Sequence, residues 1–345
     1  MSGLTREAVA AVDPAGMLGD VLAQPHQIGD ALWRVESAAI KRSDMAGGLA
    51  VAGMGGSAIG AELAAAALGR RALRPIRAVR DYALESWTHP ETLVLCASYS
   101  GETEETLALF EDATERGLPR VALTTGGRLA ERARAEGVPV IGVPSGMQPR
   151  AAVVYMVVAA LECAALCGAG PSLRAELEGA EALLRTLADE GGPDGPDDSH
   201  PKRLARELHG SVPVLYGAGA MVAVARRWKN QLNENSKLPA FWAELPEADH
   251  NEVCGWERAG DLARLHSVLL DDPDADERTR RRFEPTARIA QPASHVHPVG
   301  ANPTERVLGA VLLGDLVSVY LAALDGVDPS AIAAIEQLKS ELAEP

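Results

Sequence analysis

The stretch Ser98-Tyr99-Ser100-Gly101-Glu102-Thr103-Glu104-Glu105-Thr106 decides how the chain is organised around it. It follows the apolar run 92–97, which has the composition of a buried strand, and it precedes apolar residues spaced as in a helix, Leu107, Leu109 and Phe110. The sequence therefore predicts a strand that ends at residue 97 and a helix that begins a few residues later.

The turn between this strand and helix is rich in hydroxyl groups. They belong to Ser98, Ser100, Thr103 and Thr106, and Gly101 allows the backbone to approach a ligand closely. The first turn of a helix also leaves its N–H groups unpaired, which favours a bound anion. The pattern predicts a phosphate cradle, and because it lacks a P-loop Lys-Ser/Thr pair it favours a monophosphate over a nucleoside triphosphate. A capping segment, with Ser or Thr before the helix and acids in its first turn, explains the same residues.

Strands and helices alternate on both sides of this turn. The apolar run 49–52 enters the glycine turn 53–60, which places Ser57 at the start of a helix, and further strands are expected at 76–79, 120–124 and 138–143. Glycine turns also occur in dinucleotide folds, but here strand 76–79 lacks a simple ribose-binding acid after it. The alternation predicts a doubly wound parallel sheet with its ligand at the carboxyl ends of the strands.

Arg150 begins the apolar helix 151–166. A cation is unfavourable at a helix N-terminus, because the helix dipole prefers cations at the opposite end. We therefore expect Arg150 to face an anionic ligand; an orientation toward solvent is the alternative.

The chain of 345 residues is long enough for two domains. We expect a second α/β domain after Gly191, because residues 212–219 again show a strand that enters a glycine turn. Residues 191–198 have the composition of a flexible acidic linker. The expected division is an N-terminal helical segment at 1–45, a first domain at 46–170, a helix and linker at 171–200, a second domain at 201–328 and a C-terminal helix at 329–345.

Composition excludes several classes of partner. The net charge of −15 and the pI near 5.0 argue against binding to nucleic acid or to an anionic membrane, since both require a basic surface. Cys163 and Cys167 are expected in a helix core, and His295 and His297 have no third ligand at metal spacing, so we predict neither a metal nor a cofactor. We expect no signal sequence, and we expect no apolar run to reach the roughly 18 residues that span a bilayer. The expected location is the cytoplasm.

Several short motifs together resemble the sugar isomerase (SIS) superfamily, and more narrowly its bifunctional phosphoglucose/phosphomannose isomerases. They are spread over nearly the whole chain in the order of that family: 53–57, 98–106, Pro149-Arg150, 233–237, 250–253 and 336–339. The resemblance implies two SIS-type doubly wound parallel-sheet domains with flanking helices. It also implies aldose–ketose interconversion of a hexose 6-phosphate through a cis-enediol, without a cofactor.

The resemblance assigns roles to individual residues. Glu234 is the base that moves the proton between C1 and C2, His250 assists ring opening, Arg150 stabilises the enediolate and Lys339 lies at the ring-oxygen side. The phosphate site comprises Ser57, Ser98, Ser100, Thr103 and Thr106, with Gly55 and Gly56 against the substrate. The resemblance further implies a homodimer in which His250 enters the active site of the neighbouring subunit.

Local pattern alone leaves these roles open. A solvated helix end explains Glu234 and a surface loop explains His250, whereas Lys339 falls within the apolar face of its own helix, where it either extends to solvent or pairs with an anion. Glu102 stands where many family members carry Asn, and adds a negative charge beside the proposed phosphate. The alternative function is a catalytically silent phosphosugar-binding or regulatory SIS protein.

Overall fold

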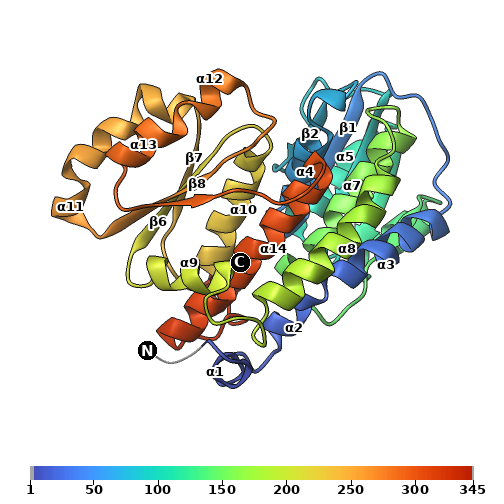
Figure 1. Ribbon diagram of the computed structural model, residues 1–345. Coiled ribbons are helices and arrows are strands. Elements are labelled where there is room, and N and C mark those ends of the chain that lie inside the picture. The colour runs from blue at the N-terminus through green and yellow to red at the C-terminus, as the bar shows by residue number, and fades with distance from the viewer. Residues whose placement is uncertain (1–3, 344–345) are drawn as a thin grey trace.

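The computed structural model describes residues 4–343 and contains two parallel sheets, one in each half of the chain (Figure 1). In the first sheet the strand order is β2-β1-β3-β4-β5. Its strands are β1 (Gly48–Gly53), β2 (Ile76–Val79), β3 (Thr92–Ala97), β4 (Arg120–Thr124) and β5 (Val140–Gly142). The central strands β1 and β3 are buried along their whole length, as expected for a parallel sheet that is covered on both faces.

Helices cover both faces of the first sheet. On one face, Val51 and Leu95 share a core with α4 (Gly55–Leu68) and α7 (Val153–Leu166). On the other face, Ala50 and Val94 pack with α5 (Glu104–Glu115) and α6 (Gly127–Ala135). The N-terminal helices precede the sheet, and the third of them packs on α7: α1 (Arg6–Ala10), α2 (Met17–Leu22) and α3 (Gln24–Ser37).

The second sheet has the order β7-β6-β8-β9. Its strands are β6 (Val212–Gly217), β7 (Phe241–Glu244), β8 (Leu265–Leu270) and β9 (Ala293–Val296). One face packs on α10 (Met221–Glu234), and the other on α13 (Phe283–Ile289). The predicted fold class, two doubly wound parallel-sheet domains with flanking helices, is confirmed.

The helix α14 (Pro303–Asp325) joins the two halves. It contacts α4 and α8 (Arg174–Gly191) on one side, and α9 (His200–Leu208) and α10 on the other; Figure 1 shows it in red between the sheets. The Trp228 indole of α10 donates a 2.8 Å hydrogen bond to the Ala310 carbonyl of α14, and its ring lies against Gly314. The position of α10, and of the residues at its end, therefore depends on α14.

The apolar helices correct one expectation from the sequence. Two segments, Pro149–Leu166 and Pro303–Asp325, are long and apolar enough to cross a membrane, so the prediction that no run reaches this length was wrong. In the folded protein, 78% and 83% of these windows are buried. Their apolar composition is explained by their positions in the core.

The segment expected to be a flexible linker is held in place. The Lys202 ammonium is buried and donates 2.9 Å hydrogen bonds to the carbonyls of Pro193 and Gly195. Strand β7 was not predicted from the sequence. The charged segment 274–283 contains the short α12 (Glu277–Arg280) and the start of α13.

Candidate active site

The order of the first sheet locates a binding crevice. Strands β1 and β3 are neighbours, but β1 leads into α4 on one face and β3 leads into α5 on the other. In doubly wound sheets, ligands bind at the carboxyl ends of the strands where the winding reverses in this way. No side chain caps the first turn of either α4 or α5. Two sets of free helix N–H groups, which favour an anion, therefore meet at this edge.

The hydroxyl-rich turn after β3 is braced from within. Ser98 is 1% exposed, and its oxygen accepts from Gly101 N at 3.0 Å and hydrogen-bonds to Thr103 Oγ1 at 2.8 Å. Thr106 is also buried and donates to the Ala97 carbonyl. Ser100, in contrast, is exposed and uses its oxygen only to accept from Glu102 N. Of these hydroxyls, that of Ser100 is the most available to a ligand, while Ser98 and Thr106 shape the turn.

The start of α4 lies directly against Arg150. Gly55 has a φ of +51°, in the left-handed region that favours glycine. A Cβ on Gly56 would lie 3.2 Å from the Pro149 carbonyl oxygen and 3.3 Å from the Arg150 Cα, so glycine permits this close approach. Ser57 is buried in the first turn, and its hydroxyl makes no hydrogen bond within residues 4–343. The three residues predicted at this turn thus border the same crevice as the turn after β3.

Glu102, the unusual acid of the turn, is paired. Its carboxylate accepts from Arg128 Nε at 2.6 Å and from Arg128 N, at the start of α6, at 2.9 Å. The hydrogen bond from the Arg128 side chain holds the pKa of Glu102 below its ordinary value. The charge of Glu102 is therefore satisfied within the protein and is turned toward α6.

Arg150 and Glu234 are brought together from opposite halves of the chain. Glu234 is the last residue of α10, and one of its carboxylate oxygens lies 3.4 Å from Arg150 Nη1. Arg150 is 3% exposed, whereas the Glu234 side chain is 31% exposed. Burial lowers the pKa of Arg150, although a guanidinium remains charged in proteins. The pair presents an accessible carboxylate next to a buried cation.

The remaining donors of Arg150 are occupied by the protein. Nε donates to Asn235 Oδ1 at 2.6 Å, and Nη2 donates to the carbonyls of Pro329 and Ser330 at 2.6 and 3.2 Å. Only Nη1 is directed toward Glu234. Arg150 therefore ties the C-terminal segment and the end of α10 to the first domain.

A second buried pair supports this arrangement from behind. Arg227 donates to the Arg150 carbonyl at 2.8 Å and to both carboxylate oxygens of Asp315 at 2.9 and 3.0 Å. Gln24 donates to the same carboxylate at 2.7 Å. Burial raises the pKa of Asp315, and the hydrogen bonds from Arg227 and Gln24 oppose that effect. The network joins α3, α10 and α14 behind the site.

His250 and Lys339 lie outside this cluster in the single chain. His250 is exposed at the end of a short 3₁₀ helix, Glu247–His250, and Lys339 is exposed on α15 (Ala333–Ala343). Within residues 4–343, neither forms a hydrogen bond or ion pair with Arg150 or Glu234. Their roles in the site remain predictions.

Sequence reasoning missed Lys237 and Asn235, although both belong to the motif that contains Glu234. The Lys237 ammonium donates to the backbone carbonyl of Glu234 at 2.5 Å. A signal was present in the sequence, because a cation and an amide follow the proposed base within three residues. Within residues 4–343, no three His, Cys, Asp or Glu side chains are grouped to hold a metal ion.

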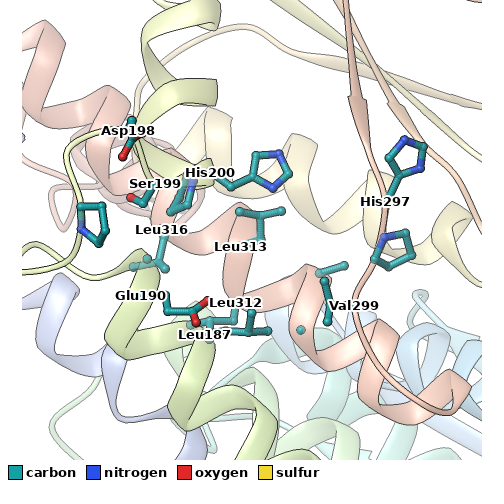
Figure 2. A pocket seen from close by; sticks show the side chains of 16 residues that line it. Leu187, Glu190, Asp198, Ser199, His200, His297, Val299, Leu312, Leu313 and Leu316 are labelled. Atoms are coloured by element: carbon teal, nitrogen blue, oxygen red, sulfur yellow. The ribbon is translucent and has the colours of Figure 1, made fainter.

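A largely apolar cavity lies away from this chemistry. Its volume is about 370 Å³, and residues of α8, α9 and α14 line it. Figure 2 shows Leu187, Leu312, Leu313 and Leu316 among its lining side chains, together with His200 and His297. Neither Arg150 nor Glu234 lines it. Among the described residues, no Lys or Arg lines it, whereas Glu190 and Asp198 do, so it does not suit a phosphate and we place the active site at the Arg150–Glu234 pair.

The fold and this site define a protein of the SIS class. In agreement, the family model of the bacterial phospho-glucose isomerase C-terminal SIS domain matches residues 197–342. A hypothetical protein from Thermus thermophilus has the same fold, with a TM-score of 0.71, 19% identity, and coverage of 98% of this chain and 93% of that protein.

Two relatives narrow the class to a family. The bifunctional phosphoglucose/phosphomannose isomerase of Caldicellulosiruptor bescii is 35% identical over 85% of this chain and 89% of its own length. The enzyme of the same name from Aquifex aeolicus is 37% identical over 86% of this chain and 90% of its own length. The chain belongs to the bifunctional phosphoglucose/phosphomannose isomerase family.

Proposed function

We propose that this protein interconverts glucose 6-phosphate, mannose 6-phosphate or both with fructose 6-phosphate. The observation that carries the proposal is the Glu234 carboxylate, held 3.4 Å from the Arg150 guanidinium at the end of α10. Arg150 lies against Gly56 in the uncapped first turn of α4, and the exposed Ser100 hydroxyl follows the neighbouring strand β3; both suit a substrate phosphate. A carboxylate base and a cation next to a phosphate site are what the isomerisation of a sugar phosphate requires.

Glu234 and Arg150 can carry out the isomerisation by moving one proton between C2 and C1. Glu234 removes the proton from C2 of the open-chain aldose, and the C–H electron pair forms the C1–C2 double bond while the carbonyl oxygen gains negative charge. Arg150, whose Nη1 lies beside the Glu234 carboxylate, stabilises this negative charge on the enediolate. Glu234 then returns its proton to C1 while the proton of the C2 hydroxyl passes to the negatively charged oxygen on C1, which gives the C2 carbonyl and C1 hydroxyl of the ketose. Protons are moved and no electrons leave the substrate.

We also propose that the protein acts as a homodimer with shared active sites. In a single chain, His250 and Lys339 are exposed and lie outside the Arg150–Glu234 cluster. The helix α15 additionally exposes Ile335, Leu338 and Leu342, and no other element packs closely against it within the described residues. A second copy would cover this apolar stripe and supply His250 to the site.

A coupled assay tests the function. Purified protein is supplied with glucose 6-phosphate or mannose 6-phosphate, and the formation of fructose 6-phosphate is measured; fructose 6-phosphate is used in the reverse direction. We expect turnover with at least one aldose. Binding of these sugars without turnover of any of them would instead identify a silent phosphosugar-binding protein.

A further inference from the structure

Lys237 has an unusual backbone conformation. Its φ is +57°, in the left-handed region, and within residues 4–343 only one other non-glycine residue, Ala39 with a φ of +48°, shares this property. A side chain with a Cβ is strained in this region, and glycine is the preferred residue just after a helix. Residues that remain strained in this way are concentrated at functional sites.

The contacts of the Lys237 ammonium do not explain why a lysine, rather than a glycine, occupies this strained position. It donates to the carbonyls of Glu234 and Asn235 at 2.5 and 3.4 Å, and so lies at the C-terminus of α10, where the helix dipole favours a cation. A glycine would remove the strain and leave these carbonyls to water, because Lys237 is exposed. Partial desolvation of the ammonium, and the charge of Arg150 next to it, both lower the pKa of Lys237.

Arg150, the other cation beside Glu234, is held in place by the protein. Arg150 uses Nε and Nη2 to bind Asn235 and the carbonyls of Pro329 and Ser330, so only Nη1 faces Glu234. Lysine carries a compact charge on a flexible stem, and its three donors can exchange a protein carbonyl for a substrate oxygen.

We propose that Lys237 is a further catalytic residue, whose ammonium binds the enediolate oxygens as negative charge develops on them. This inference rests on the proposed isomerase function. Arg150 and Lys237 flank Glu234, one directed at its carboxylate and the other at its backbone carbonyl. Lys237 exchanges the carbonyl for the substrate oxygen in the transition state, so it lowers the barrier without tightening the binding of the ground state.

The test is Lys237→Gly, which removes the charge and the strain together. We expect kcat to fall about 10²- to 10³-fold with KM unchanged, as when one donor to a developing oxyanion is lost. The melting temperature should equal or exceed that of the parent, because glycine is favoured at this φ. Added methylammonium should restore part of the lost kcat. Lys237→Asn, also tolerant of left-handed backbone, is a second neutral variant that should show the same kinetic loss.

Ala39→Gly is the matched control. It relieves strain at the other left-handed position, at the end of α3, and should leave kcat and KM unchanged. A folded Lys237→Gly protein with the kcat of the parent would overturn the proposal, and so would a raised KM with kcat retained, which would indicate binding of the ground state. Wild-type protein is assayed in the same series. If it turns over none of the sugar phosphates, the proposed function itself fails, and this inference fails with it.

Discussion

At the scale of single residues, Arg150 is the side chain on which the site depends. Its guanidinium contacts Glu234 and Asn235 at the end of α10 and the carbonyls of Pro329 and Ser330 after α14. Four strands lie between Arg150 and Pro329 in the chain, yet one buried cation fixes the two segments together. A buried charge is costly unless it is hydrogen-bonded, so these acceptors offset the burial of the Arg150 guanidinium.

Ser100 provides a residue-scale prediction. The variant Ser100→Ala should raise KM about tenfold and change kcat less, because a hydrogen bond to a phosphate is present in the ground state and in the transition state alike. Steady-state kinetics with the preferred aldose phosphate measure both constants. Ser98→Ala is the comparison variant, since Ser98 braces the turn from within and should lower the melting temperature. An unchanged KM with a reduced kcat in Ser100→Ala would show that Ser100 acts on the chemistry.

The sequence identified some of these residues for a physical reason and could not identify others. Arg150 was expected to face an anionic ligand because a cation is unfavourable at a helix N-terminus; the structure buries it, and its contact with a ligand stays a prediction. The directions of the Ser98 and Thr106 hydroxyls could not be foreseen, because they depend on hydrogen bonds formed only when the turn closes. Lys237 was missed because backbone strain cannot be read from residue types.

At the scale of elements, β3 occupies the residues predicted for it, 92–97, because a fully buried parallel strand is a continuous apolar run. Strand β7 was not predicted, since it lies at the edge of its sheet and is only partly buried. The place of α14 between the two sheets could not be predicted from the sequence, because it follows from tertiary packing with α4, α8, α9 and α10.

The contact of α10 with α14 gives an element-scale prediction. A Cβ at Gly314 would lie 2.2 Å from Trp228 Nε1, so Gly314→Ala must displace the indole. We expect the free energy of unfolding to fall by about 1–3 kcal/mol, as measured by urea denaturation. Gly309→Ala on the same helix meets the flexible end of Leu187 at 3.1 Å and the Val299 carbonyl oxygen only at 3.4 Å, and should cost less. Equal stabilities of the two variants would contradict the described packing.

The helix α15 gives a second prediction at this scale. Removal of residues 333–345 should lower the melting temperature only by the contribution of the proposed dimer contact, because no other described element of the same chain packs closely against α15. Activity should nevertheless fall, because Lys339 is lost, and Lys339→Ala in the full chain should reproduce the loss. Differential scanning calorimetry and the coupled assay give the two readings. Full activity in both variants would exclude Lys339 from the site.

At the scale of the whole molecule, the proposed dimer predicts complementation between two inactive variants. If Glu234 and His250 of one active site come from different chains, a heterodimer of Glu234→Gln with His250→Ala has one intact site and one doubly damaged site. Refolding equal amounts together should restore about a quarter of the wild-type activity, since half of the dimers are mixed and each has one intact site.

Each variant refolded alone is the control, and size-exclusion chromatography establishes the dimer. A verified heterodimer without activity would place both groups in the same chain, and a monomer at assay concentration would end the shared-site proposal.

Isomerisation in D₂O by wild-type protein and by Glu234→Gln tests the central claim most directly. The base that removes the C2 proton exchanges it with solvent, so the wild type should introduce deuterium into the product and into recovered substrate, as observed by NMR. Glu234→Gln replaces the carboxylate with a carboxamide of similar shape and leaves all the phosphate donors in place, so it should still bind the sugar phosphate but introduce no deuterium. Deuterium incorporation by Glu234→Gln at the wild-type rate would contradict the assignment of Glu234 as the base.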